Sequence, residues 1–303
     1  MRDLKEHRIA NSPAEAVAML NAGPGKGCYV AGGTDLNLGN AECDYLVDIT
    51  QAGLNGINSS DQGDVLIGAA TPLQDCFNDI ALKEYAGGAI SQVAGQCGEL
   101  SIRSKATIGG NLCNASPSAD MAPVLMALDA VCIILDEESQ ESIPLAEFFV
   151  APGRTVLEGS LLAGVILPGE AALWRCRSYR LTRSAEDVPL VQVAVAVEVT
   201  DGVISQARIA LGAVAPIPLR SQLAENFLVN QKVAELTPEM VEDVALLAAS
   251  ECDPLDDELA SAEYRTDMVR VLTRRMICRV LAEEGMVTCV DADHVEGDDG
   301  GAA

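Results

Sequence analysis

Two short glycine-containing stretches carry residue types suited to binding an anion. VAGGTDL (Val30–Leu36) follows a strand-like run, and ATIGGN (Ala106–Asn111) opens a polar stretch that leads to Asp120. Glycine lacks a Cβ, so it can adopt positive φ and turn backbone N–H groups toward a ligand. Clusters of such N–H groups bind anions. Either Gly-Gly pair alone is typical of a turn, but the two in this order, followed by Asn111 and Asp120, predict two sides of a pyrophosphate site.

A third glycine-rich segment, GPGKGC (residues 23–28), does not fit this pattern. Lys26 is followed by Gly27 rather than by Ser or Thr, so the P-loop fingerprint is not met. The segment also precedes its strand instead of following one. We interpret it as a flexible turn in which Gly25 tolerates substitution.

The charge balance excludes two classes of partner. Forty-five acidic residues against 20 basic ones give a net charge of −25, whereas nucleic acids and anionic membranes are bound through Lys and Arg. No apolar run reaches the roughly 18 residues of a membrane span, and the N-terminal residues lack the apolar core of a signal peptide. We therefore expect a cytoplasmic protein that binds no nucleic acid and has no membrane span.

Cysteine and histidine, the usual ligands and nucleophiles, are not arranged for chemistry. The ten cysteines are scattered without a C-x-x-C pair, which predicts reduced thiols in the core rather than a zinc or iron–sulfur site. The two histidines, His7 and His294, lie near opposite ends of the chain. A Ser-His-Asp triad or a histidine metal centre is therefore not expected, and we predict no catalytic and no metal-binding residue.

The elements that must position the glycine motifs follow from periodicity and turn signals. A short helix is expected after Ser12 and Pro13, ending before Gly23. Helices are also expected over Leu73–Cys97 and in MAPVLMALDA, which begins near Asp120. The expected strands are CYVAGGTDL, DYLVDI, DVLIGAAT, VCIILD and LAGVILP, with ESIPLAEFFVAPGRT as a loop between the last two.

The pattern changes near residue 172. Longer alternating strands follow, with Asp201-Gly202 as a hairpin turn, and then helices at Leu219–Val229, Pro238–Ser250 and Leu259–Glu284. The acidic, glycine-rich end from 288 to 303 predicts disorder. The chain is therefore expected to be an α+β protein with a second domain beginning around residue 172.

Four motifs in order resemble one known family. They are AGGTDL, IRSKATIGGNLCNASPSADMAPVLMALDA, FFVAPGRTVL and YRLTRSAEDVPLVQVAVAV. The sequence resembles the FAD-binding medium subunit of molybdenum hydroxylases, which includes the xanthine dehydrogenase flavin domain and the carbon monoxide dehydrogenase flavoprotein. The resemblance implies a PCMH-type FAD-binding domain at 1–171, with subdomains at about 1–55 and 56–171. It also implies a smaller C-terminal α/β domain at 172–287 with an antiparallel sheet and helices.

The resemblance further implies which residues hold FAD noncovalently. Ala31–Asp35 would line one side of the pyrophosphate and Thr107–Asn111 the other, while Asp120 falls at a flavin or ribityl contact and Leu162 where the family packs a leucine on the cofactor. By sequence alone, Asp120 could equally be a helix N-cap. The complete set of predicted cofactor-binding residues is Val30, Ala31, Gly32, Gly33, Thr34, Asp35, Ala106, Thr107, Ile108, Gly109, Gly110, Asn111, Asn114, Asp120, Leu162, Tyr179 and Arg180.

Three positions depart from the family pattern. Arg180 stands where the family often has Lys, Cys97 where some members place an aromatic ring against the flavin, and Ser160 where many have Glu. Tyr179 is then the remaining aromatic candidate to cover the flavin ring.

The implied activity is electron transfer within an oxidoreductase complex. In the family, a large molybdopterin subunit hydroxylates the substrate, and a small subunit with 2Fe–2S clusters passes electrons to this flavin and on to an external acceptor; a dimer of heterotrimers is the expected assembly. One alternative is a free-standing flavin oxidase or dehydrogenase, many of which tether FAD through a histidine that is missing near either motif here. A second alternative is a non-catalytic subunit that has lost FAD, against which both Gly-Gly pairs, Asn111 and Asp120 argue.

Overall fold

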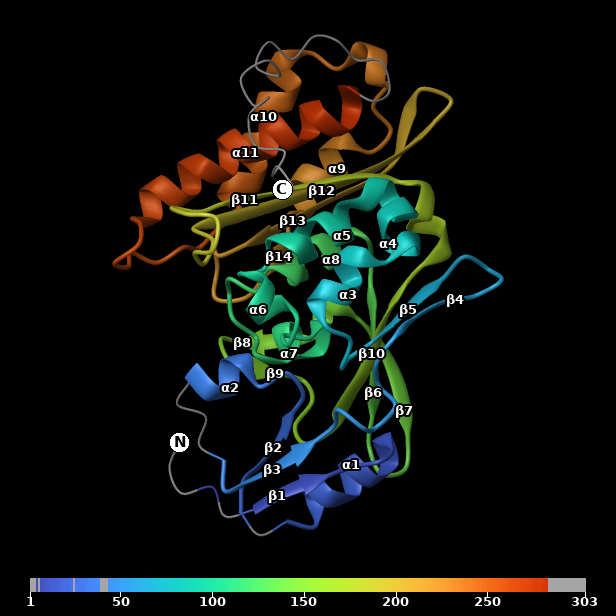
Figure 1. Ribbon diagram of the computed structural model, residues 1–303. Helices are drawn as coiled ribbons and strands as arrows, with labels where there is room; N and C mark the ends of the chain where they lie inside the picture. Colours follow the sequence, from blue (N-terminus) through green and yellow to red (C-terminus); the bar gives the residue numbers. More distant parts are fainter. Residues whose placement is uncertain (1–3, 5, 24, 39–42, 283–303) are drawn as a thin grey trace.

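The computed structural model describes residues 4, 6–23, 25–38 and 43–282. The described chain forms three consecutive units, drawn in blue at the bottom, cyan to green in the middle and yellow to red at the top of Figure 1. Each unit has a hydrophobic core of its own. The expected α+β class is confirmed. The predicted disordered tail, 288–303, lies outside the described residues.

The N-terminal unit is a small parallel sheet in the order β1-β3-β2 with one helix against it. Its elements are β1 (Glu6–Ile9), α1 (Pro13–Asn21), β2 (Gly27–Val30), α2 (Thr34–Leu38) and β3 (Tyr45–Asp48). The predicted start of α1 is confirmed, because the Ser12 hydroxyl accepts a hydrogen bond from the Glu15 N–H at 3.2 Å and Pro13 occupies the first turn. The strand predicted in CYVAGGTDL ends at Val30, so the glycine motif lies just beyond it.

The middle unit is built on an antiparallel sheet in the order β4-β5-β10-β6-β7. Its strands are β4 (Ile57–Ser59), β5 (Val65–Gly68), β6 (Val131–Leu135), β7 (Gln140–Pro144) and β10 (Leu161–Leu167), with a separate hairpin of β8 (Phe149–Ala151) and β9 (Arg154–Thr155). The prediction of an unstructured loop after β6 is therefore wrong. This segment contains β7, which pairs with β6 along its whole length, and the β8–β9 hairpin.

Short helices cover the middle sheet. They are α3 (Leu73–Asn78), α4 (Ile80–Glu84), the 3-10 helix η1 (Tyr85–Gly88), α5 (Ala89–Gln96), α6 (Leu100–Arg103), α7 (Ile108–Cys113), α8 (Met121–Ala127) and the 3-10 helix η2 (Leu145–Glu147). The single helix predicted over Leu73–Cys97 is broken in two places. Asp79 begins a new helix by accepting the Leu82 N–H, and the chain turns at Ala86 (φ 49°) and Gly87 (φ 71°).

The C-terminal unit is an antiparallel sheet in the order β11-β12-β13-β14 with helices on one face. Its elements are η3 (Gly169–Leu173), β11 (Arg175–Leu181), β12 (Val191–Thr200), β13 (Val203–Gly212), β14 (Leu219–Arg220), α9 (Gln222–Leu228), η4 (Val233–Glu235), α10 (Pro238–Ser250) and α11 (Ala262–Ala282). The Asp201-Gly202 turn is confirmed, with φ of 52° and 76°. The helix predicted over Leu219–Val229 starts later, because its first two residues form β14.

The two faces of strand β12 pack into two different hydrophobic cores. Its valines at 191, 193, 195 and 197 belong to the core shared with α9, α10 and α11, whereas Ala194 and Ala196 belong to the core of the middle unit. Helix α8 packs against this alanine face, and all seven of its residues are buried.

A polar link holds the far end of α8 to the C-terminal sheet. Asp129, in a left-handed conformation (φ 50°) just after the helix, receives Arg208 Nε at 2.8 Å and Arg220 Nη1 at 2.7 Å on its two carboxylate oxygens. Arg220 also pairs with Glu225 at the start of α9. Within the described residues, none of the helices is both long and apolar enough to cross a bilayer.

Candidate functional site

The two glycine motifs, far apart in sequence, are in direct contact. A Cβ placed on Gly32 would lie 1.8 Å from the carbonyl oxygen of Lys105 and 3.0 Å from the Ala106 nitrogen. Only glycine allows the loop after β2 to lie this close to the segment before α7 (Figure 1). The contact brings the first motif of the N-terminal unit to the start of the second motif in the middle unit.

The first motif presents unpaired backbone donors. Gly33 has a positive φ of 69°, and in the described part of the chain the N–H groups of Ala31, Gly32 and Gly33 meet no acceptor. Thr34 and Asp35 form the first turn of α2 directly after them. Consecutive N–H groups in such a turn form a concave site for an anion. This half of the predicted pyrophosphate site therefore has the donors that it needs.

The second motif uses its donors internally. The Ile108 N–H donates to Thr71 O at 3.0 Å and the Gly109 N–H to Ala69 O at 2.9 Å. The Gly110 N–H donates to the Thr107 hydroxyl at 3.0 Å, which makes Thr107 the N-cap of α7. Neither Gly109 nor Gly110 has a positive φ. The prediction that this pair turns free N–H groups inward at positive φ is therefore wrong.

The glycines of α7 serve close approach instead. A Cβ on Gly109 would lie 2.6 Å from Ala69 O, so this glycine lets the helix pack on the turn after β5. Gly110 is exposed, as are Cys113 and Asn114 on the same side of the helix. A ligand could thus lie on a helix face that begins with bare backbone at Gly110. Ala106, half-buried, packs against the middle core just before it.

Asp120 stands at the start of α8 but does not cap it. The cap comes from Asn111, whose Oδ1 accepts the Met121 N–H at 3.1 Å, and the Asp120 side chain makes no capping hydrogen bond. Asp120 thus occupies the N-cap position considered for it, but the capping hydrogen bond comes from another side chain. The Asp120 carboxylate instead lies 3.1 Å from Nε of Arg180, and both side chains are largely buried.

Gln192 is the site residue that the sequence reasoning missed. It lies directly opposite Arg180 in the β11–β12 ladder, and its Nε2 donates to Asp120 Oδ1 at 3.2 Å. The side chain is 2% exposed, and among the described residues its Oε1 has no hydrogen-bond partner. The sequence does hold a signal, since Gln192 is the polar exception in PLVQVAVAV, on the face otherwise made of alanines.

The surroundings of Asp120 raise the pKa of its carboxyl group. Burial raises the pKa of Asp120 to about 6, against the opposing effect of the Arg180 charge and a hydrogen bond with Cys97. Burial also raises the pKa of the Cys97 thiol well above its ordinary value, and its Sγ lies 3.9 Å from Met121 Sδ. Cys97 is thus a protonated core thiol next to the carboxylate.

The hydrogen bonds of Arg180 explain why an arginine rather than a lysine stands at this position. Besides facing Asp120, it donates to Gln96 O, to Ala185 O at 3.2 Å and to Asp187 O at 2.8 Å. A lysine has one nitrogen and could not reach these separate acceptors at once. Arg180 therefore ties the end of α5 and the loop before β12 to β11.

Three further predicted residues lie in strands, two of them packed into hydrophobic cores. Tyr179 packs against the C-terminal core, on the face of β11 opposite to that of Arg180, because neighbouring residues in a strand point to opposite sides. This placement gives no support to the prediction that Tyr179 covers a flavin ring beside Asp120. Leu162 is 2% exposed and belongs to the middle core, and Val30 is the last residue of β2.

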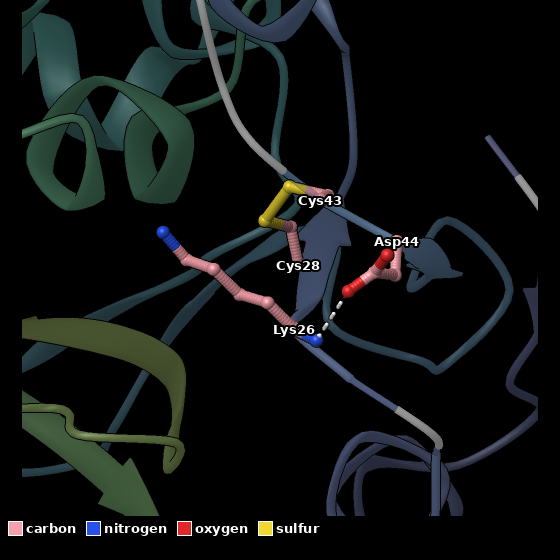
Figure 2. The surroundings of a disulfide bond; sticks show 4 residues. All are labelled: Lys26, Cys28, Cys43 and Asp44. Atoms are coloured by element: carbon pink, nitrogen blue, oxygen red, sulfur yellow. Dashed lines mark hydrogen bonds between the residues drawn. A yellow bond between two sulfur atoms is a disulfide. The ribbon is translucent and has the colours of Figure 1, made fainter. Parts of the chain in front are cut away.

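Two cysteines at the base of the first motif are oxidised. Cys28 and Cys43 form a disulfide with a Cα–Cα distance of 5.9 Å, as Figure 2 shows. The prediction that all the cysteines are reduced thiols is therefore wrong. The spacing between Cys28 and Cys43 belongs to no motif, so the sequence did not indicate this disulfide.

The turn before β2 is more constrained than predicted. Gly25 has a φ of 95°, and a Cβ there would lie 2.3 Å from Asp44 Oδ2. The same carboxylate accepts the Lys26 N–H at 2.9 Å (Figure 2). The prediction that Gly25 tolerates substitution is therefore wrong.

Comparison with known proteins covers both halves of the chain. Residues 6–170 match the family described as the FAD binding domain in molybdopterin dehydrogenase, and residues 177–280 match the CO dehydrogenase flavoprotein C-terminal domain. The chain belongs to the FAD-binding medium subunits of molybdenum hydroxylases. The resemblance read from the motifs is thereby confirmed, and with it an oxidoreductase subunit with an FAD-binding domain.

Individual medium subunits agree with this assignment. The glyceraldehyde dehydrogenase medium chain of Sulfolobus acidocaldarius is 30% identical, covering 77% of this chain and 81% of its own. The xanthine dehydrogenase FAD-binding subunit of Escherichia coli O157:H7 is 28% identical over 94% of this chain and 99% of its own. A solved structure of carbon monoxide dehydrogenase from Hydrogenophaga pseudoflava matches with a TM-score of 0.86, 27% identity, and coverage of 91% and 97%.

Proposed function

We propose that this medium subunit passes electrons from 2Fe–2S clusters in a partner subunit, through noncovalently bound FAD, to an external acceptor. The observation that carries the proposal is the contact between Gly32 and Lys105, which sets the unpaired N–H groups of residues 31–33 next to the segment that leads into α7. Bound FAD would supply the redox chemistry.

In this proposal the chain's own residues bind and orient the cofactor. The N–H groups of Ala31, Gly32 and Gly33 bind the pyrophosphate, next to Thr34 and Asp35. The bare backbone at Gly110 lets the cofactor lie on α7. The helix itself is positioned by the residues that begin it, Thr107, Ile108, Gly109 and Asn111, and Asn114 lies at its C-terminal end. The donors of this second segment are already used, so its role is steric rather than electrostatic.

Asp120 is proposed to face the flavin or ribityl end. Arg180 and Gln192 hold its carboxylate from the C-terminal sheet at 3.1 and 3.2 Å. The C-terminal unit thus orients a cofactor contact without having to touch the cofactor itself.

The proposed division of the chain follows the family matches and the cores. Residues 1–171 form the PCMH-type FAD-binding domain, with subdomains at about 1–55 and 56–171, and residues 172–287 form the C-terminal domain. The proposed partners are a large molybdopterin subunit, which binds the substrate, and a small 2Fe–2S subunit, in a cytoplasmic dimer of heterotrimers. Support comes from relatives named as medium chains or FAD-binding subunits of dehydrogenases.

The test uses the purified chain and its flavin spectrum. We expect about one FAD per chain, as for a single-site flavoprotein, released into the supernatant by acid precipitation. Under anaerobic conditions, dithionite should reduce this flavin, whereas purines, N-heterocycles, aldehydes and CO should not until the partner subunits are added.

Three results would contradict the proposal. Direct bleaching by one of these substrates at a catalytic rate would favour a free-standing flavin enzyme. Yellow colour that stays in the acid pellet would show a covalent flavin. A chain that binds no flavin at all would be a subunit without a redox role.

A further inference from the structure

The Cys28–Cys43 disulfide closes the base of the proposed pyrophosphate loop. Cys28 is the second residue of β2, and Cys43 lies two residues before β3. The chain between them carries the unpaired N–H groups of residues 31–33 and helix α2. Figure 2 shows the bond joining Cys28, in β2, to Cys43, where the connection returns toward the start of β3.

Besides the disulfide, the parallel pairing of β2 with β3 and a few further hydrogen bonds hold the base of the loop. The Lys26 N–H donates to the Asp44 carboxylate at 2.9 Å, and the Asp44 N–H donates to Lys26 O at 2.7 Å. Further along, the Tyr29 hydroxyl donates to Gly159 O at 3.3 Å. Such exposed or half-exposed hydrogen bonds exchange with water at little net cost. The disulfide adds a covalent link between β2 and the residue at which the loop returns.

A restraint at this place acts on ligand affinity. The donors of residues 31–33 are backbone N–H groups, so any freedom left in the loop must be lost when an anion binds. A cross-link that limits the alternative conformations of the unbound loop removes part of that loss beforehand. The oxidised chain should thus bind a pyrophosphate-containing ligand more tightly than the reduced chain.

The pair is less buried than the core cysteines Cys76, Cys132 and Cys176. Cys28 and Cys43 are half-buried, so an external thiolate can reach them. Burial raises the pKa of Cys76, Cys132 and Cys176 to about 12, and buried protonated thiols exchange poorly. A dithiol reductant would therefore act on this pair ahead of those three cysteines.

We propose that Cys28 and Cys43 form a thiol–disulfide exchange site that sets the affinity of the chain for FAD. The proposal rests on the proposed function of the loop after β2. A dithiol donor, small molecule or protein, attacks one sulfur and forms a mixed disulfide, and its second thiol then displaces the cysteine. The donor loses two electrons and becomes a disulfide, while Cys28 and Cys43 gain two electrons and two protons and become thiols. A disulfide of the same class reverses the step.

The experiment compares three forms of the full chain after removal of flavin. They are the oxidised protein, the protein reduced with dithiothreitol, and the Cys28→Ser/Cys43→Ser double variant, each titrated with FAD by fluorescence. A non-reducing digest followed by mass spectrometry identifies the Cys28–Cys43 cross-link, and circular dichroism checks that all three forms are folded. Cys252→Ser, a change of a half-buried free thiol in the C-terminal unit, is the matched control.

We expect the Kd for FAD to rise by about tenfold or more on reduction, as a binding loop loses its preorganisation. The double variant should show the same rise and no further response to dithiothreitol, whereas Cys252→Ser should behave as the unaltered chain. Dithiothreitol also acts on the disulfide of Cys278, so a Cys278→Ser chain compared before and after reduction keeps the test decisive even if the double variant fails to fold.

The outcomes separate this proposal from the proposed function. Tight FAD binding of equal strength in the oxidised and reduced forms would overturn the switch and leave the flavoprotein function intact. The same holds if mild oxidation yields no Cys28–Cys43 cross-link. No FAD binding in any form, the oxidised one included, would overturn the proposed function and this proposal with it.

Discussion

Arg180 and Gln192 lie directly opposite each other on β11 and β12, and both side chains meet the same carboxylate oxygen of Asp120. Their strands belong to the C-terminal unit, whereas Asp120 begins the central helix of the middle unit. The carboxylate is thus held by a domain that contributes neither glycine motif.

Replacing Gln192 with Leu should weaken FAD binding without unfolding the protein. The change removes the Nε2 donor to Asp120, and a hydrogen bond to a charged group is worth about 1.5–3 kcal/mol; we expect FAD affinity to fall by about tenfold. The unpaired Oε1 disappears with it, so thermal stability should change little. Gln206→Leu, at the other end of the same sheet, is the control. FAD titration and melting curves give both readouts, and unaltered affinity in Gln192→Leu would contradict the assignment.

The two glycine motifs should respond differently to alanine. In Gly32→Ala the new Cβ meets the Lys105 carbonyl at 1.8 Å, which forces the backbones apart. We expect loss of most bound FAD together with a lower melting temperature.

In Gly110→Ala the new Cβ meets only the Thr107 hydroxyl, at 3.0 Å. Alanine is favoured over glycine inside a helix by up to about 1 kcal/mol, so the melting temperature should hold or rise. FAD affinity should nevertheless fall, because the methyl group occupies the face proposed to hold the cofactor. A Gly110→Ala chain that keeps its full FAD affinity would show that this face is not used.

Asp120→Asn should remove a pH dependence of stability. The pKa of Asp120 is raised from 3.8 to about 6 in the folded chain, so the native state holds this proton more tightly than the unfolded state. The resulting stabilisation is complete below the unfolded pKa and is lost as pH rises through about 6. Relative to the variant, the native chain should lose up to about 3 kcal/mol of unfolding free energy between about pH 4 and pH 7.

Urea unfolding of both proteins across this range measures the difference. Asp136→Asn is an informative control, because hydrogen bonds from the N–H groups of Glu138 and Ser139 lower the pKa of Asp136. The relative slope should then have the opposite sign. Parallel stability profiles for the Asp120→Asn and unaltered chains would rule out a raised pKa at Asp120.

Asp129→Asn should destabilise the contact between α8 and the C-terminal sheet. The change leaves Arg208 and Arg220 without their shared carboxylate, and breaking a partly buried ion pair of this kind costs about 2 kcal/mol or more. Asn accepts the left-handed backbone at this position. Asp201→Asn is matched in backbone conformation, with φ of 52° at the exposed hairpin, and should be neutral. Equal melting temperatures for the two variants would contradict this role of Asp129.

The sequence predicted the elements that are determined by residues close together in the chain. Ser12 and Pro13 marked the start of α1, Asp201-Gly202 marked the hairpin, and the alternation after residue 190 marked β12 and β13. The interruption of the helix over Leu73–Cys97 was not visible, because it depends on how Ala86 and Gly87 turn the chain between packed helices.

The site shows the same division. The glycine motifs were found, but a glycine in sequence does not say whether it provides positive φ, as at Gly33, or room for a neighbour, as at Gly109. Asn111 and Asp120 were found, but the capping hydrogen bond considered for Asp120 comes from Asn111, because a cap depends on which side chain reaches the helix N–H groups in the fold. The Cys28–Cys43 pair was missed because its spacing belongs to no motif and its closeness comes from the pairing of β2 with β3.

Helix α8 is surrounded on every side, by the middle core and by the alanine face of β12. A chain cut after β10 would turn its buried methionines, leucine and valine out to water on one side, and the helix has no polar face to present there. The middle and C-terminal units should therefore melt as one cooperative block.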